Sequence, residues 1–483
     1  MNKKTISILV ILLTASLLGF SQKNLPVKVL TDTLFEQLKE LKSNMISLQA
    51  IRINGNKKTR DFVILGEMNL KIGERIDIGD INRKLQSCAE SVYNSNLFSE
   101  VTIEPVLISN DEFIIKVNVV EKWTIYPLPY FQLSDRNFNE WWSTYHGDLK
   151  RTIYGVVFSD FNFSGTSDRL NIGLLNGFSK LIAVNYSSPI TKHKTTKLFS
   201  FGAEYYENKS FAYETNEKNK LNFYNNSFFV KKNLLLKSSY IVRQGLYSKQ
   251  SLSLQYNIIK IVDSVFIKKF NRSYLNDTSP NIHFPDFIYQ YQLVKTNNNN
   301  YPTKGKMLFL RFLKRGFGLM GDVNLFSVDA SYKRFYSYRN NFYMSCHLLG
   351  NIKIPFKQAY INQRAIGYGE QYLRGLENYV IDGVAFGVSK FTLSKKLLSY
   401  RIPMPFNSRM IPYIPLSIFA KTYLDMGYAY HAQTVNSPLN NTFLYTGGVG
   451  IDLLSLYDMR FSLEFSFNQL KEKGLFLHSR SGF

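Results

Sequence analysis

Apolar and polar residues alternate along most of the chain, which predicts many β-strands. Segment 461–468 has an apolar residue at every second position and a polar one between, and the same period recurs in 252–258, 308–312 and 342–348. Lipid offers the backbone no hydrogen-bond partners, so strands with one apolar face cross a membrane only as a closed barrel. At roughly 20–25 residues per strand and connection, 124–483 would form about 16 antiparallel strands.

A large soluble β-sandwich or β-propeller is the alternative, because its strands also alternate. No blade-like repeat is visible in the sequence. A soluble chain of this length would also divide into several domains, whereas one barrel would not. The pattern therefore favours a single all-β transmembrane barrel.

The region before the barrel, 47–123, mixes strand and helix patterns. ISLQAIRING alternates up to Ile53 and stops at Asn54-Gly55, and the apolar spacing of 81–92 fits an amphipathic helix with Asp80 as its N-cap. Two strands joined by the turn-like SNDE follow. The order β-α-α-β-β predicts one small α+β domain.

The first residues predict export. Lys3 and Lys4 precede an apolar run over 6–20 and a small residue at position 21, so residues 1–21 read as a secretory signal peptide. The alternative is a membrane anchor, but the run is short for a span of roughly 20 residues. Residues 22–46 read as a linker with a helical turn or two.

Composition narrows the classes of partner. The formal charge is +23, and the chain has 38 Phe and 32 Tyr. A basic exported chain faces solvent, anionic lipid headgroups or acidic polymers, and export argues against nucleic acid. Cys88 and Cys346 are the two cysteines, too few for a disulfide framework, so both are interpreted as small packed hydrophobes.

The sequence contains no recognisable catalytic motif. There is no nucleophile elbow, and GGVGIDL lacks the context of a phosphate-binding loop. The histidines show no metal-ligand spacing. They are His146, His193, His283, His347, His431 and His478. We expect no enzyme, no metal and no cofactor.

Several elements of the small domain resemble a POTRA domain, the periplasmic module of outer-membrane assembly and secretion proteins. These are IRINGNKKT, LKIGERID, NSNLFSEVTIE and VNVVEKW, in a single copy. The residues that carry the resemblance are Gly55, Asn56, Gly73, Leu97 and Phe98. An exposed edge strand of such a sheet would capture an extended client by β-augmentation.

A second motif is GYGEQYLRGLENYVIDG. An arginine in a membrane barrel must face an aqueous lumen or pair with an acid. Arg374-Gly375 resembles the arginine-glycine motif that the BamA/TamA-like superfamily carries on a long extracellular loop. The resemblance implies that this loop folds into the lumen and meets an aromatic-x-Asp-x-Gly motif, here Tyr423, Asp425 and Gly427. The alternative is an ordinary surface arginine and a turn aspartate.

The motif departs from the family at one position. Leu376 follows Arg-Gly where the family usually has an aromatic residue, and Tyr379 is the candidate to supply that ring. The pair would act as a structural lock or switch, joined by a bidentate bond in a partly dehydrated site.

The first barrel segment, TIYPLPYFQL, contains Pro127 and Pro129, which cannot donate ladder hydrogen bonds. If it pairs with the last strand, which ends near the aromatic Phe483, the closing seam would be short and weak. The resemblance implies that relatives open such a seam sideways. The alternative is a rigid linker between two domains.

The resemblance covers 47–483 and implies a POTRA-plus-barrel protein in the outer membrane of a Gram-negative bacterium, with the POTRA domain (47–123) in the periplasm and the barrel at 124–483. It implies an insertase that binds unfolded outer-membrane proteins. A secretion pore for one polypeptide and a structural or channel barrel are the alternatives. Periplasmic or lipoprotein partners and outer-membrane lipids would accompany any of these functions.

Overall fold

The structure is a computed structural model. Two of the sequence-based predictions concern residues that it does not describe. The signal peptide (1–21) and Phe483 lie outside the described residues. The described residues are 27–29, 45–68, 70–109, 111–134, 141–142, 145–189, 197–244, 247–261, 271, 273–275, 281–298, 301–318, 323–369, 371–403, 413–432, 437–455 and 460–480.

The N-terminal domain is a five-stranded mixed sheet with two helices; it contains the predicted β-α-α-β-β elements and two short strands that were not predicted, β1 before them and β3 between the helices. Its sheet has the order β1-β4-β5-β2-β3. The elements are β1 (Val27–Val29), β2 (Met45–Asn54), α3 (Asp61–Met68), β3 (Arg75–Asp77), α4 (Ile78–Asn94), β4 (Phe98–Ser109) and β5 (Glu112–Glu121).

The structure corrects two details of this domain. Helix α4 is capped by Asp77, whose side chain accepts a hydrogen bond from the Gly79 amide at 2.8 Å. Asp80 lies in the first turn and pairs with Arg83 instead. Strand β1 falls in the segment interpreted as a linker, yet it pairs in parallel with β4, because an open edge offers unpaired backbone groups.

One face of α4 packs on the sheet to form the domain core, and its buried residues are Ile81, Leu85, Cys88, Ala89 and Val92. The Cys88 thiol lies 2.7 Å from the Met68 carbonyl oxygen. Burial raises the pKa of Cys88 to about 11, so the thiol stays protonated and unreactive at neutral pH.

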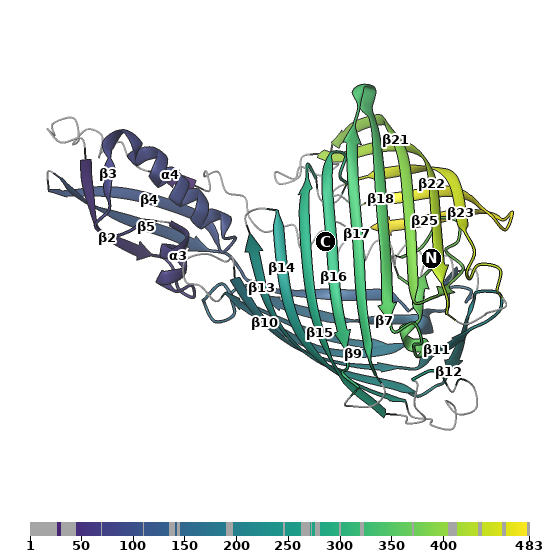
Figure 1. Ribbon diagram of the computed structural model, residues 1–483. Helices are drawn as coiled ribbons and strands as arrows, with labels where there is room; N and C mark the ends of the chain where they lie inside the picture. The colour runs from purple at the N-terminus through teal and green to yellow at the C-terminus, as the bar shows by residue number, and fades with distance from the viewer. Residues whose placement is uncertain are drawn as a thin grey trace.

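The rest of the chain forms a 16-stranded antiparallel sheet that curves into a barrel beside the N-terminal domain (Figure 1). Its first eight strands are β6 (Ile125–Leu133), β7 (Thr152–Asp160), β8 (Arg169–Gly177), β9 (Ser179–Pro189), β10 (Lys197–Asn208), β13 (Lys231–Gln244), β14 (Ser248–Ile261) and β15 (Asn281–Thr296). The last eight are β16 (Gly305–Arg315), β17 (Leu325–Ser337), β18 (Phe342–Ile354), β21 (Ala385–Pro403), β22 (Tyr413–Tyr430), β23 (Leu444–Leu454), β24 (Arg460–Asn468) and β25 (Lys473–Arg480). The predicted fold class is confirmed.

Short elements lie in the connections between barrel strands. They are η1 (Leu149–Arg151), β11 (Ser210–Thr215), β12 (Leu221–Asn225), η2 (Arg339–Asn341), η3 (Tyr360–Asn362), β19 (Arg364–Ile366) and β20 (Ile381–Asp382). Strands β11 and β12 form a hairpin, and β19 pairs with β20. Within the described residues, no helix has the length and hydropathy needed to cross a bilayer.

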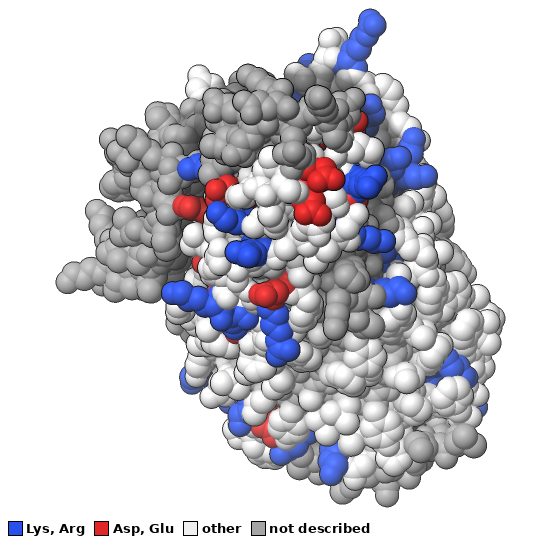
Figure 2. All heavy atoms as spheres, turned by 90° about the vertical axis from the view of Figure 1, so that its left-hand side faces the viewer, with Lys and Arg blue, Asp and Glu red and all other residues white. Residues whose placement is uncertain are grey.

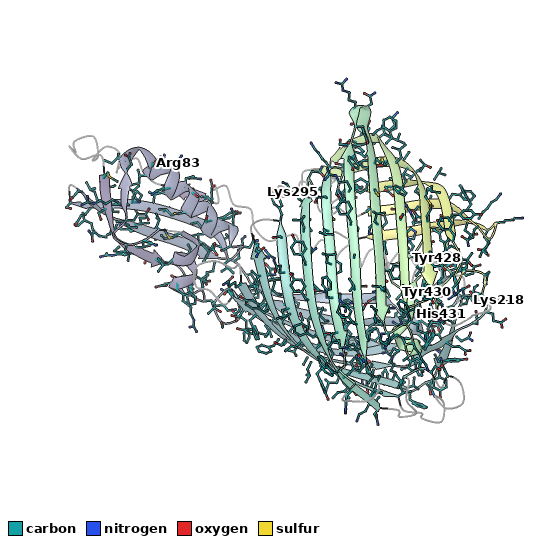
Figure 3. All side chains as sticks on the ribbon, viewed as in Figure 1. Arg83, Lys218, Lys295, Tyr428, Tyr430 and His431 are labelled. Carbon is teal, nitrogen blue, oxygen red and sulfur yellow. The ribbon has the colours of Figure 1, made fainter. Side chains whose placement is uncertain are left out.

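The strands have one apolar and one polar face, as the alternation predicts. On β24, Phe465 is 44% exposed on the outside, while its neighbour Glu464 is 3% exposed toward the interior. Tyr428 and Tyr430 near the end of β22 are likewise exposed (Figure 3). Because one row of side chains faces lipid and the next faces the lumen, the sheet satisfies its backbone and both environments.

Strand direction places the long connections. Strand β6 begins beside the N-terminal domain, and each following strand reverses. The connection 355–384 between β18 and β21, here called the lumen loop, therefore starts at the barrel end opposite that domain. The β11–β12 hairpin lies at the same far end.

Candidate functional site

The lumen loop folds back against the inner wall of the barrel. Loop residues Leu373 and Leu376 and wall residues Val388, Ala429 and Leu444 belong to one buried apolar cluster. A loop that leaves its own apolar side chains among wall residues is fixed by burial, in addition to any polar contact.

The structure brings Arg374 and Asp425 together in a bidentate ion pair. Arg374 Nε lies 2.9 Å from Asp425 Oδ2, and Nη2 lies 2.5 Å from Oδ1. The Arg374 backbone amide also donates to Oδ2, at 3.1 Å. The Asp425 side chain is fully buried and that of Arg374 is 11% exposed, so a fork-shaped donor meets a desolvated carboxylate. We call these two residues the lumen pair.

Other wall groups complete the guanidinium site. Nη1 donates to Thr392 Oγ1 at 3.0 Å, and Nη2 lies 3.4 Å from the Phe391 carbonyl oxygen, both on β21. The guanidinium also lies 3.9 Å from the centroid of the Tyr423 ring. Arg374 is thus held by two adjacent strands, β21 and β22.

The aromatic-x-Asp-x-Gly spacing has a direct structural reason. Positions 423, 425 and 427 of β22 all point inward, because alternate residues of a strand share a face. Tyr423 stacks under the guanidinium and Asp425 accepts its hydrogen bonds. Gly427 leaves room for Leu373, whose Cδ1 would lie 3.2 Å from an added Cβ.

Gly375 is required by both backbone and packing. Its φ of +89° lies in the left-handed region, and an added Cβ would lie 2.9 Å from Ser466 Cβ on β24. Leu376 is 2% exposed in the apolar cluster. Tyr379 lies elsewhere, with its hydroxyl 2.6 Å from Glu472, so it does not take the position of an aromatic after Arg-Gly.

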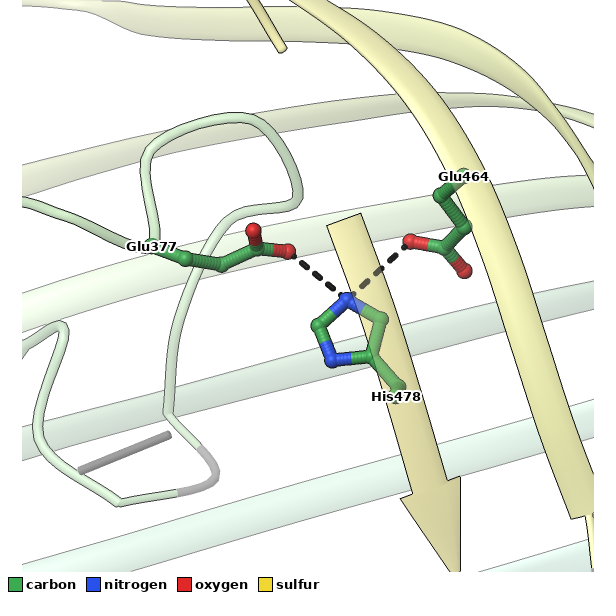
Figure 4. A group of neighbouring side chains, drawn as sticks. All are labelled: Glu377, Glu464 and His478. Atoms are coloured by element: carbon green, nitrogen blue, oxygen red, sulfur yellow. Dashed lines mark ion pairs between the residues drawn. The ribbon is translucent and has the colours of Figure 1, made fainter. Parts of the chain in front are cut away.

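Further charged residues face the lumen pair from the wall. Lys421 on β22 contacts Asp452 on β23 and Glu464 on β24, each at 2.5 Å. Glu464 and Glu377 in turn flank His478 of β25 (Figure 4). The sequence analysis did not identify this group. The alternation of apolar and polar residues along β24 places Glu464 on the face toward the lumen, and this is the signal that could have identified it.

A polar cavity of about 270 Å³ adjoins these residues. Its lining includes Tyr372, Arg374, Lys390, Lys421 and His478. The interior beside the lumen pair is therefore a small polar space rather than a solid apolar core.

The turn after β2 joins the N-terminal domain to the barrel. Lys58 Nζ lies 2.9 Å from the Asp160 carboxylate at the end of β7, and Asn162 donates to Thr59 Oγ1 at 2.9 Å. The Arg60 amide donates to the Gly165 carbonyl oxygen at 2.9 Å. The domain is therefore docked on the β7–β8 turn, next to the first strand of the barrel.

The predicted POTRA-motif residues build this turn and the core behind it. Gly55 has a φ of +92°, and an added Cβ would lie 2.0 Å from the Val119 carbonyl oxygen. Asn56 donates to the Thr59 carbonyl oxygen. The remaining motif residues are structural: Gly73 is a turn glycine, and Leu97 and Phe98 are core residues.

Glu121 at the end of β5 holds the same turn by accepting the backbone amides of Lys58 and Thr59. Burial disfavours the charged form of Glu121, but the hydrogen bonds from Thr59 and Lys58 outweigh this effect and lower its pKa. Figure 2 shows Lys and Arg spread over the face on this side with Asp and Glu among them, so charge marks no single patch there.

The two end strands of the barrel sheet, β6 and β25, are not hydrogen-bonded to each other in the part of the chain that the structure describes. Residues 125–133 pair with β7 along their whole length, so they form a strand and not a linker. Just before β6, the Thr124 carbonyl oxygen accepts from Phe161, and just after it the Ser134 amide donates to Arg151.

In a strand, the amide and carbonyl groups of successive residues point to opposite edges, so these two bonds fix the edge to which each residue of β6 points. The amide and carbonyl groups of even-numbered residues point toward β7, so those of odd-numbered residues point toward the outer edge of β6. Pro127 and Pro129 are both odd. The outer edge therefore lacks two of its five amide donors, and retains those of Ile125, Phe131 and Leu133.

The N-terminal domain also matches a known family. Residues 46–122 match the POTRA family, described as surface antigen variable number repeat. The domain precedes a 16-stranded barrel with an apolar outer face. The chain is a POTRA-plus-barrel outer-membrane protein. Its barrel spans the outer membrane of a Gram-negative bacterium and its POTRA domain lies in the periplasm, so the lumen loop enters from the extracellular end.

Solved structures show the same fold. BamA from Haemophilus ducreyi lacking POTRA domains 1–3 has a TM-score of 0.62 at 14% identity, with 90% of this chain and 83% of that chain covered. CdiB from Escherichia coli has a TM-score of 0.51 at 15% identity, with 90% and 75% covered. Curated proteins give no match to the sequence. At these identities the likeness concerns the fold alone.

Proposed function

We propose that this POTRA-plus-barrel protein is an assembly factor that receives unfolded outer-membrane proteins from the periplasm and releases them into the bilayer. The observation that carries the proposal is the junction between β6 and β25, which is unpaired over the residues that the structure describes. Free strand edges in a membrane-embedded sheet are templates for another strand. The function consists of binding and passage, and we assign it no chemical step.

The composition of the edge supports an opening seam. Pro127 and Pro129 occupy positions whose backbone faces the outer edge, so β6 offers few amide donors to β25. The free energy gained by closing the seam is therefore small. An entering strand competes with that weak pairing rather than with a full ladder. The β25 edge contains no proline within Lys473–Arg480.

The POTRA domain supports delivery to this place. Its contacts with Asp160 and Asn162 hold it at the periplasmic end of β7, and Asp160 pairs in register with Ile125 of β6. Among the described residues, β1 pairs only with Val101–Ile103 of β4, and we propose that the rest of that edge takes up clients by β-augmentation. A client captured there would be held by a domain that is docked next to the first barrel strand.

The lumen loop argues against a permanently open pore. It crosses the interior and is fixed by the lumen pair, so a polypeptide passing through the lumen would have to displace it. Secretion of one dedicated polypeptide is the competing function. The two functions differ in which proteins the cell would lose if this protein were depleted.

Depletion of the protein in its own bacterium tests the proposal, with quantitative proteomics of the outer-membrane and secreted fractions. Loss of many unrelated barrels, with unfolded forms in the periplasm, is the expected result. Loss of one secreted protein with a normal membrane proteome would assign the secretion function. No change in either fraction would contradict both functions and leave a structural or channel barrel.

A seam cross-link tests the mechanism in liposomes. In a Cys88→Ala, Cys346→Ser background, cysteine pairs scanned across β6 and β25 yield a disulfide-locked barrel. Oxidised protein should fail to accelerate folding of a barrel client, and reductant should restore the rate. The matched control is a pair at Leu463 and Leu477, which lie opposite each other on β24 and β25. Equal activity of the locked seam and the control would refute the seam mechanism.

A further inference from the structure

We propose that Glu377, Glu464 and His478 form a binding site for a divalent transition-metal ion such as Zn²⁺. The site joins the lumen loop to the last two barrel strands. Its three residues come from the loop, β24 and β25, and their side chains converge on one point (Figure 4).

The spacing of the donor atoms fits such an ion. His478 Nε2 lies 3.0 Å from Glu377 Oε1 and 3.5 Å from Glu464 Oε2, and one donor atom from each residue lies within 4.8 Å of the other two. Bonds of about 2.0–2.2 Å in a tetrahedral zinc site separate neighbouring donor atoms by about 3.3–3.6 Å. Small side-chain shifts therefore bring all three atoms to the same ion.

Buried lone pairs at the centre lack hydrogen-bond donors. Glu377 is 6% exposed, and apart from the ion-pair contact of Oε1 with His478 Nε2 its carboxylate oxygens have no hydrogen-bond partner among the described residues. Glu464 Oε2 and His478 Nε2 are in the same condition, while Glu464 Oε1 is taken by Lys421. Burial of an uncompensated carboxylate is costly. A single proton on Nε2 serves only one carboxylate at a time, whereas a dication satisfies three donor atoms together.

The ligand set selects the class of ion. One imidazole nitrogen and two carboxylate oxygens suit Zn²⁺, Co²⁺ or Mn²⁺, and the absence of thiolate from the set disfavours Cu(I). Ca²⁺ takes about 6–8 oxygen ligands, more than this site offers. Glu464 and His478 also line the polar cavity of about 270 Å³, which leaves room for a water as a fourth ligand.

Neighbouring groups hold the histidine ring in place. Tyr372 of the lumen loop stacks on His478, with ring centroids 5.7 Å apart and an interplanar angle of 21°. Lys390 Nζ in turn lies 4.4 Å from the centroid of the Tyr372 ring. A fixed imidazole orientation lowers the entropic cost of metal binding.

Metal binding would give the loop a second attachment. Glu377 lies three residues after Arg374, which is bound to β22. The ion would bind the same turn to β25, the last strand in the order of the barrel sheet. Binding itself is independent of the proposed function, and an effect of the ion on client insertion would rest on it.

Metal titration of the full-length, tag-free protein in detergent tests the site. After treatment with a chelator, Co²⁺ is added and followed by its visible absorption, and Zn²⁺ by calorimetry. We expect one ion per chain with tetrahedral Co²⁺ absorption. His478→Gln and Glu377→Gln should each weaken binding at least about tenfold, and His283→Asn on the distant β15 should leave it unchanged.

Each outcome decides the proposal. Semi-native gel mobility verifies that each variant is folded, and either ligand variant is sufficient if the other does not fold. Absence of stoichiometric binding by the wild-type protein would overturn the site, and so would binding that His478→Gln leaves intact. In either case the cluster is a protonated histidine between two carboxylates.

Discussion

Replacement of Arg374 by alanine should release the lumen loop from the barrel wall. The variant loses both charge-assisted bonds to Asp425, the bond to Thr392 and the contact with the Tyr423 ring. Asp425 stays fully buried and keeps one donor, the backbone amide of residue 374. The carboxylate becomes an uncompensated buried charge.

The expected loss follows from that burial. Removing one partner of a buried pair typically costs about 3–5 kcal/mol, because the other charge remains desolvated. We expect about 3 kcal/mol for Arg374→Ala, the lower end, since Arg374 lines the adjoining polar cavity and truncating it lets water from that cavity approach Asp425. Asp425→Asn keeps one carbonyl acceptor for the guanidinium and should cost less.

A double-mutant cycle measures the pair directly. Unfolding of Arg374→Ala, Asp425→Asn and the double variant in urea is followed by semi-native gel mobility in lipid–detergent micelles. The double variant should be more stable than the sum of the single losses predicts, by about 2 kcal/mol. The control is Arg311→Ala, whose 3.5 Å contact with Asp329 is more exposed and should contribute less than about 1 kcal/mol.

The cycle also gives the refuting result. Additive effects of the two single variants would show that Arg374 and Asp425 do not act on each other. A loss from Arg374→Ala no larger than that from Arg311→Ala would show that the loop is held by its apolar residues alone.

Three further outcomes are expected. Gly375→Ala should destabilise the folded loop by about 1–3 kcal/mol through its positive φ, and Ser466→Gly should restore only part of the loss by removing the close contact; unfolding in urea measures both. In a Cys346→Ser variant, maleimide should label Cys88 slowly at neutral pH and rapidly after unfolding, and rapid labelling of folded protein would contradict its burial. The stabilisation from Glu121, whose pKa is lowered, is present above its unfolded pKa of about 4.3 and is lost as pH falls through the folded value. Unfolding at neutral and acidic pH should therefore differ less for Glu121→Gln than for wild type, and an equal difference would exclude this residue.

Local patterns in the sequence determined the barrel and the two faces of its strands. Side chains of a strand alternate with a period of two wherever it pairs, so Phe465 and Glu464 could be assigned to opposite faces without knowing their neighbours. The separation of 423, 425 and 427 by two residues placed them on one face for the same reason. The left-handed glycines Gly55 and Gly375 are also local requirements.

Contacts between distant segments were decided only by the tertiary structure. Glu377, Glu464 and His478 meet because the lumen loop returns across three strands, and no spacing in the sequence encodes that return. The pairing of β1 with β4 depends on an open sheet edge, which becomes visible only once the strand order is known. Both arrangements follow from register and closure, which are properties of the whole sheet and not of any segment.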